Sequence, residues 1–310
     1  MAKQLIAFST IVLFLFSCVK ELQLPPNTIS QRVVVNSLFN PDTILHVHVS
    51  LSKSPKQSGS YLIQAYDEID FVENAVVKLF KDGTFIQDLV YTENGWYNSF
   101  HFPVENAQYR IEVSVPDFDM VWAESYVPRY PEITQQAVCK YIGPAVVQDV
   151  EYIARETKIF FKDEIGEDFY GFYAYMGSFN FIDREKVTDP SLLADVDFSI
   201  MWGDFFSSIN FRDVLFEGQN KVLSFQGAGF GVNTTSTGFD LRFGSVSKEY
   251  YRFFDALYKH IVNADPSSNL DDPIALLFMG NPIESYSNIN GGLGIFAGYN
   301  YKLLNIIYVD

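Results

Sequence analysis

Cysteine and basic side chains are both scarce in this sequence. Only two of the 310 residues are cysteines, Cys18 and Cys139, so no network of disulfides can hold the fold. Stability must come from a packed core, for which a composition of 48% hydrophobic and 16% aromatic residues is ample. Lys and Arg number 22 against 38 Asp and Glu, a net charge of -16. Because no basic run occurs, we expect no nucleic-acid partner.

Familiar catalytic motifs are also missing. The sequence contains no Gly-x-Ser-x-Gly, His-Glu-x-x-His, Cys-x-x-Cys or P-loop pattern. This excludes the hydrolases, zinc proteases, redox proteins and nucleotide-binding proteins that such patterns identify. We therefore expect a protein that is not an enzyme and has no cofactor.

The one long apolar run lies at the start of the chain. Lys3 precedes the run Leu5–Phe16, which is shorter than the roughly 20 residues that a membrane-spanning helix needs. The following residues, Leu15-Phe16-Ser17-Cys18, resemble the lipobox of bacterial lipoproteins. We expect a signal peptide at 1–17, removed before Cys18, and a lipidated tether at 18–30. The resemblance implies diacylglycerol on the thiol of Cys18 and a third chain, such as palmitate, on its amine. The alternative is a buried cysteine at the end of a hydrophobic helix.

Alternating patterns predict strands in the next hundred residues. Between Ile44 and Ser52, leucine or valine fills every second position, which is typical of a half-buried strand. Asp82-Gly83 and Asn94-Gly95 favour hairpin turns, because glycine supplies a positive φ. Further strands are predicted at 32–36, 75–80, 85–91, 96–102, 109–115 and 120–126. About seven short strands are expected of an immunoglobulin-like β-sandwich, which we assign to residues 31–128.

Pro128 and Pro131 mark the expected boundary to a second domain at 132–310. Longer, aromatic-rich strands are predicted there at 151–162, 169–181, 198–206, 221–226 and 239–243. Residues 247–263 instead show helical spacing of apolar side chains, with Ser247 as a capping residue. The predicted fold class is mainly β: an N-terminal immunoglobulin-like β-sandwich followed by a larger β-rich domain with one packed amphipathic helix.

Several stretches together resemble a known family. They are Val33–Asn36, Phe160–Tyr173, Asp213–Gln219, Ser247–Phe254, Asn281-Pro282 and, most specific, Ser287–Tyr299. With the lipobox, they look like a family of Bacteroidota outer-membrane lipoproteins known only as domain of unknown function 4249. That family has no assigned activity, so the resemblance implies no catalytic residues. It implies an outer-membrane lipoprotein, exposed at the cell surface and often encoded beside TonB-dependent transporters.

The glycines of the most specific stretch also have a physical interpretation. Gly291, Gly292 and Gly294 permit a sharp turn and a close approach of two backbones. Ile295 and Phe296 then enter a strand. The spacing of these glycines matches neither the P-loop nor the dinucleotide-binding pattern, which are the two glycine-rich patterns that bind phosphate.

Two histidines are the weak candidates for a metal site. His46 and His48 alternate along one predicted strand, so both imidazoles lie on one face and could bind Zn²⁺ or Cu²⁺. No Cys or His cluster accompanies them in the sequence. We favour the alternative of two solvent-facing histidines.

Acidic residues gather in three places. Asp163–Asp168 places four acids around a glycine and could hold Ca²⁺, but it lacks the alternating spacing of calcium loops, so we favour a solvated hairpin tip. Asp195 with Asp197 and Asp271 with Asp272 are further pairs. Such pairs would suit a glycosidase only at a defined separation across a cleft.

These patterns lead to three hypotheses for function, of which the third is a purely structural role. The first is a surface lipoprotein of the outer membrane, held in the bilayer through acylated Cys18, that serves as a non-enzymatic accessory subunit of a β-barrel complex. A TonB-dependent nutrient importer is the first choice of complex, and a barrel-assembly or export machine is a variant. The alternative is a glycan-binding or glycan-processing surface lipoprotein, with Trp96 and Trp202 as candidate contact residues.

Lipidation gives the first test. Cys18→Ala is expected to abolish labelling by an alkyne analogue of palmitate and to release the protein from membranes, because each buried methylene contributes about 0.8 kcal/mol to anchoring. Cys139→Ala is the matched control and should label as the wild type does. Labelling that persists in Cys18→Ala would contradict the lipoprotein assignment.

Overall fold

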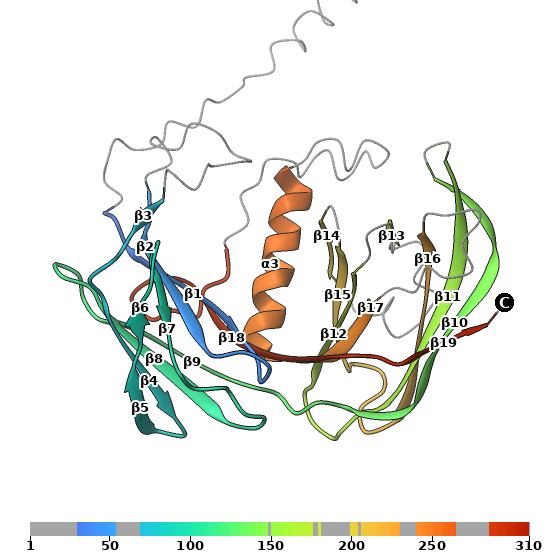
Figure 1. Cartoon of the computed structure of the whole chain (residues 1–310), viewed down its shortest axis with the longest axis horizontal. Helices are drawn as coiled ribbons and strands as arrows, with labels where there is room; N and C mark the ends of the chain where they lie inside the picture. Colours follow the sequence, from blue (N-terminus) through green and yellow to red (C-terminus); the bar gives the residue numbers. More distant parts are fainter. Residues whose placement is uncertain are drawn as a thin grey trace, which may run out of the picture.

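The computed structural model describes residues 30–53, 69–147, 150–175, 179–180, 199–203, 206–229, 240–264 and 285–309. Strands dominate these residues, and they form several sheets around the helix α3 (Lys248–Ala264). The predicted fold class, mainly β with a packed helix, is confirmed. The strands are arranged in two lobes with α3 between them (Figure 1).

In the described part of the chain, three sheets make up the two lobes. The largest has the order β14 (Ser199–Gly203), β15 (Phe206–Arg212), β12 (Phe169–Tyr175), β17 (Asp240–Val246), β18 (Leu293–Leu303), β1 (Val33–Phe39), β2 (His46–Leu51), β7 (Trp96–Asn98) and β6 (Val90–Tyr91), with β3 (Asp70–Phe71) beside β2. The second has the order β13 (Phe179–Asn180), β16 (Asn220–Gly229), β11 (Val150–Lys162), β10 (Glu132–Val147) and β19 (Ile306–Val309). The third has the order β5 (Thr84–Asp88), β4 (Val76–Lys81), β8 (Gln108–Ser114) and β9 (Val121–Tyr126).

The first lobe is a β-sandwich. Buried residues alternate with partly exposed ones along β1 and β8, as the period of two predicts. The inward side chains form one core, which includes Val35, Val47, Leu79, Tyr109 and Ile111. Both predicted hairpin turns are present, with positive φ at Asp82-Gly83 and at Asn94-Gly95.

The second lobe has its own, more aromatic core. Phe161 and Phe225, from one sheet, face Phe172, Phe211 and Phe243, from the other. The rings of Phe172 and Phe225 stack with their centroids 4.5 Å apart. Burial within this core raises the pKa of the Cys139 thiol. An aromatic interior of this kind buries much apolar area per residue, which suits a chain with only two cysteines.

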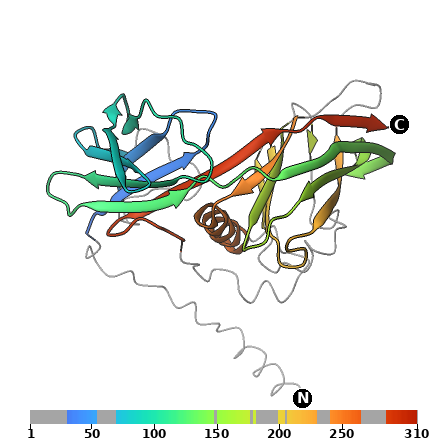
Figure 2. The same cartoon turned by 90° about the horizontal axis from the view of Figure 1, so that it is seen from below.

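One strand belongs to both lobes. The first half of β18 pairs in parallel with β1, from Val34↔Leu293 to Phe39↔Gly298, and its second half pairs antiparallel with β17, from Val246↔Tyr299 to Arg242↔Leu303. Figure 2 shows β18 as a long red strand that crosses from one lobe to the other. Its buried Phe296 lies in the core of the first lobe. The predicted domain boundary between residues 128 and 132 stays a prediction. The sandwich of the first lobe is nevertheless completed by β18, which lies far beyond residue 132 in the sequence.

The family's most specific stretch builds the start of β18. The Asn288 side chain accepts a hydrogen bond from the Phe296 amide (2.9 Å) and donates one to the Phe296 carbonyl (2.7 Å). Gly294 has a φ of +109°, and a Cβ there would lie 2.0 Å from the Val35 carbonyl oxygen. The predicted sharp turn and close backbone approach are therefore confirmed.

The helix fills the space between the lobes. The Ser247 hydroxyl accepts a hydrogen bond from the Tyr250 amide at 3.3 Å, so Ser247 caps the helix as predicted. Tyr250 and Tyr251 pack against aromatic residues of the large sheet, among them Phe169 and Tyr301. The start of the helix thus belongs to the core, where Tyr251 is buried, whereas Phe253, Phe254 and Leu257 are only partly buried.

Four of the predicted strands are wrong in detail. The described part of 169–181 is divided between β12, in the largest sheet, and β13, in the second sheet. The segment 85–91 is two strands in different sheets, because the chain crosses the sandwich at Leu89, whose amide bonds the Val77 carbonyl. The segment 96–102 is a strand only as far as Asn98. The described part of 198–206 comprises β14 and the first residue of β15, which form a hairpin. The long strand β10 was not predicted, because three register shifts interrupt its alternation.

The shared strand gives a stability test. Gly294→Ala is expected to lower the free energy of unfolding by about 3 kcal/mol or more, because the new methyl group meets the Val35 carbonyl at a φ that L residues avoid. Gly83→Ala, at a φ of +76° with open space around it, should cost only about 1 kcal/mol. Urea denaturation measures the free energy of unfolding of both variants and of the wild type. Equal losses of stability in the two variants would contradict the close approach of Gly294 to the Val35 carbonyl.

Candidate functional site

Three carboxylates meet where two turns of the second lobe touch. Asp163 and Asp168 come from the turn between β11 and β12, and Asp213 comes from the turn between β15 and β16. One oxygen from each lies within 4.8 Å of the others. Asp163 is 1% exposed and Asp213 is also buried. We call these three residues the carboxylate cluster.

The two turns are joined by the hydrogen bonds of the cluster. Asp163 accepts a short hydrogen bond from the Tyr170 hydroxyl and another from the Gly218 amide at 2.6 Å. Asp213 accepts one from the Asp168 amide at 3.2 Å. Two of the three carboxylates therefore satisfy backbone donors in the turns, which is a structural role.

Burial and mutual repulsion make this cluster hold protons more tightly than exposed acids do. Burial, together with the charges of Asp163, Asp213 and Glu164, raises the pKa of Asp168 to about 6. Burial also raises the pKa of Asp163 and that of Asp213, although hydrogen bonds from Tyr170 and Gly218 oppose the rise at Asp163. Whenever these groups are ionised, their negative charges repel one another.

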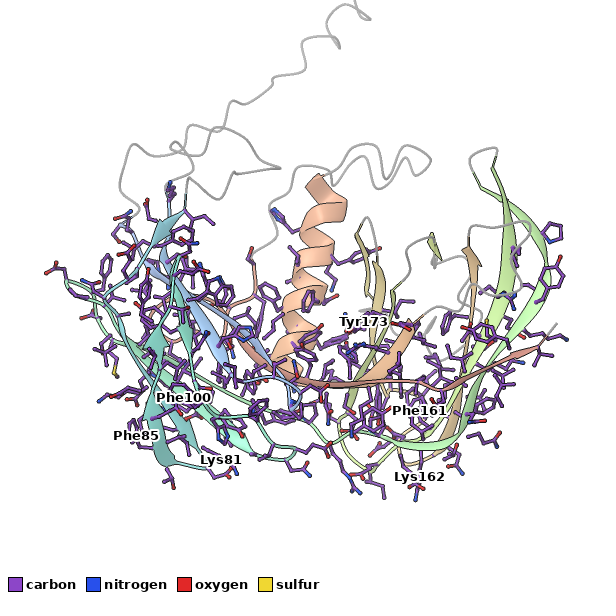
Figure 3. All side chains as sticks on the ribbon, in the orientation of Figure 1. Lys81, Phe85, Phe100, Phe161, Lys162 and Tyr173 are labelled. Atoms are coloured by element: carbon purple, nitrogen blue, oxygen red, sulfur yellow. The ribbon has the colours of Figure 1, made fainter. Side chains whose placement is uncertain are left out.

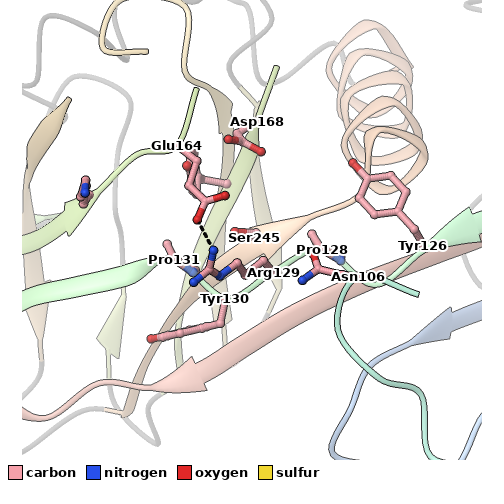
Figure 4. Close-up of a pocket in the computed structure, with 11 residues that line it drawn as sticks. Asn106, Tyr126, Pro128, Arg129, Tyr130, Pro131, Glu164, Asp168 and Ser245 are labelled. Atoms are coloured by element: carbon pink, nitrogen blue, oxygen red, sulfur yellow. Dashed lines mark hydrogen bonds and ion pairs between the residues drawn. The ribbon is translucent and has the colours of Figure 1, made fainter. Parts of the chain in front are cut away.

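A small cavity of about 130 Å³ lies beside Asp168, at the junction of the lobes. Figure 4 shows it between the linker that follows β9 and the turn that carries Glu164 and Asp168. Arg129 of the linker forms a 2.6 Å ion pair with Glu164. Burial, with the charges of Glu249 and Asp168, raises the pKa of Tyr126 to about 12.

The cluster has ligands of the type that a hard cation prefers. Carboxylate oxygens suit Ca²⁺, which takes six to eight oxygen ligands. The interpretation of Asp163–Asp168 as a solvated tip holds for the exposed residues 164–167 and is wrong for Asp163. Sequence reasoning missed Asp213, whose only signal was its place in a stretch that resembles the family. Binding of Ca²⁺ stays an untested hypothesis.

The histidine pair lies elsewhere, on the outer face of the first lobe. His46 and His48 alternate with the buried Val47 and Val49, as predicted, and both are partly buried. Their rings contact Trp96 with centroids 5.3 Å and 4.9 Å away. Metal binding by the pair, which was the less favoured alternative, stays untested.

Other sequence-based candidates lie outside the described residues. They are Cys18, Asp195, Asp197, Asp271, Asp272, the Asn281-Pro282 motif and the side chain of Trp202. Within the described part of the chain, no helix has both the length and the apolar character needed to cross a membrane.

Fold and site define a class of protein: a two-lobed, mainly β protein whose lobes share one strand. Residues 19–303 match the family described as Domain of unknown function (DUF4249). The match covers most of the chain, so this protein belongs to that family. Among curated proteins, no match is found.

The carboxylate cluster gives a pH-dependent test. The folded-state pKa of Asp168, about 6, lies above its ordinary value of 3.8, so this group makes the folded state less stable as pH rises from 4 to 6. Asp168→Asn should therefore be more stable than the wild type at pH 7, by up to about 3 kcal/mol. The difference should vanish below pH 4.

Urea denaturation in EDTA buffers between pH 4 and 8 measures this difference. Asp88→Asn, on the exposed strand β5, is the control and should follow the wild type at every pH. A destabilised Asp168→Asn at pH 7 would contradict the repulsion described for the cluster.

Proposed function

We propose that the protein is a non-enzymatic, lipid-anchored accessory subunit that docks on an outer-membrane β-barrel protein. The supporting observation is an exposed aromatic surface on the first lobe. Phe100 is 80% exposed, Phe102 54% and Phe85 50%. We call these three residues the phenylalanine patch. Exposed apolar patches of this kind mark interaction surfaces.

The loop after β7 holds two of these rings outward. The Ser99 hydroxyl donates to the His101 carbonyl at 3.0 Å, and the His101 ring lies 2.9 Å from the Tyr109 hydroxyl. That hydroxyl also accepts a hydrogen bond from the Val104 amide. The alternate residues Ser99 and His101 are therefore held against the lobe by hydrogen bonds. This leaves the side chains of Phe100 and Phe102 facing solvent. A loop held in this way loses little entropy on binding.

The third residue, Phe85, comes from the neighbouring sheet, where its ring packs against that of Phe80. The Gln87 side chain accepts a hydrogen bond from the Phe100 amide at 3.3 Å. Phe85 lies two residues from Gln87 on β5, so both side chains share one face of the strand. Phe85 and Phe100 lie in the same part of the first lobe in Figure 3. Exposed aromatic side chains are typical centres of protein interfaces.

The choice of a barrel partner rests on the sequence. The lipobox at Cys18 and the resemblance to outer-membrane lipoproteins support an anchor in that membrane, probed by the Cys18→Ala experiment. Within it, a TonB-dependent nutrient importer is our first choice, and a barrel-assembly or export machine is the variant. A glycan-related role is supported by a different surface of the same lobe, taken up below.

The docking proposal predicts the effect of a double substitution. Phe100→Ser with Phe102→Ser should reduce co-purification of the barrel partner at least tenfold, since loss of about 1.4 kcal/mol of binding energy is already a tenfold weakening. Tagged full-length protein is extracted from outer membranes in mild detergent, and its partners are quantified by mass spectrometry.

Ile165→Ser is the matched control. Ile165 is 89% exposed on the second lobe, so its replacement removes an equally accessible apolar side chain and should leave the complex intact. Thermal denaturation verifies that the double variant is folded. Wild-type protein recovered without a barrel protein, or full recovery of the partner by the double variant, would contradict the proposal.

A further inference from the structure

A second surface of the first lobe combines an aromatic ring with polar groups. A shallow hollow of about 320 Å³ is lined by His46, Thr92, Glu93, Trp96 and Asn98. We call it the Trp96 hollow. Its residues come from β2, from β7 and from the hairpin that leads into β7.

Strand register brings these side chains together. Trp96 pairs with His48 and Asn98 pairs with His46 across β7 and β2. Side chains that pair directly across two strands lie on one face of the sheet. His48 also contacts the Phe71 ring, with centroids 5.6 Å apart. The indole ring thus contacts both imidazoles, each in a T-shaped arrangement.

Polar groups around the ring are available to a ligand. Within the described residues, neither the indole N–H of Trp96 nor the side chains of Glu93 and Asn98 take part in a protein hydrogen bond. By contrast, His46 Nδ1 lies 3.2 Å from the Ile44 carbonyl oxygen. The hollow therefore offers donors and acceptors beside a fixed aromatic surface, as ligand sites commonly do.

We propose that the Trp96 hollow binds a neutral glycan. The face of an indole ring is negatively polarised and attracts the C–H groups on the apolar face of a pyranose ring. Asn98 and Glu93 can then bind sugar hydroxyls. The carboxylate of Glu93 and the net charge of -16 disfavour acidic sugars, because like charges repel. The open shape suits a segment of a long chain.

This inference is independent of the docking proposal. The phenylalanine patch and the Trp96 hollow share no residue, so each can be removed without the other. A protein with both could hold a polysaccharide near its membrane partner, and either activity could exist alone. The variants below separate the two.

Affinity electrophoresis of the full chain in detergent tests the site. Native gels contain a panel of neutral polysaccharides, namely starch, xyloglucan, galactomannan and β-glucan, with alginate and polygalacturonate as acidic comparisons. At least one neutral polysaccharide should retard the wild type, and the acidic ones should not. Trp96→Ala and Asn98→Ala should each weaken that retardation about tenfold, or about 1.4 kcal/mol.

The double variant Phe100→Ser with Phe102→Ser is the control and should bind the polysaccharide as the wild type does. Asn98→Ala keeps the aromatic contacts of Trp96, so its loss of binding cannot come from misfolding of that cluster. No retardation by any neutral polysaccharide, or equal retardation of the wild type and Trp96→Ala, would overturn the inference. Neither result would alter the test of docking.

Discussion

The double pairing of β18 is the constraint on which the rest of the structure depends. Residues 293–298 complete the first lobe beside β1, and residues 299–303 continue directly into the second lobe beside β17. Gly298 lies where these partners change, so close to the Tyr126 carbonyl that a Cβ would lie 2.1 Å from its oxygen. The cores of the two lobes are therefore connected by the continuous backbone of β18.

The surfaces discussed above gain their geometry from that frame. Asn300 of β18 donates to the Pro128 carbonyl at 3.1 Å, which fixes the linker that borders the small cavity near Asp168. The Ser125 hydroxyl, in the first lobe, bonds Glu249 of the helix at 3.0 Å. The phenylalanine patch and the Trp96 hollow lie on the sandwich that β18 completes. Preorganised surfaces on a rigid scaffold are the arrangement that binding proteins use.

Local features were predictable from the sequence, and long-range ones were not. The turns at Asp82-Gly83 and Asn94-Gly95 and the helix capped by Ser247 rest on neighbouring residues, so a single stretch predicts them. The pairing of β18 with β1 joins residues about 260 positions apart, which no local pattern encodes. The same holds for the sites. Two acids of the carboxylate cluster stood in one predicted cluster, but Asp213 joined them only through folding.

Native-state hydrogen exchange measures the coupling of the lobes most directly. If β18 joins both lobes into one cooperative unit, the most protected amides of β2 and of β16 should exchange through a single global opening, with the same free energy and the same dependence on denaturant. Two plateaus of clearly different free energy, one for each lobe, would contradict the account and show that the lobes unfold separately.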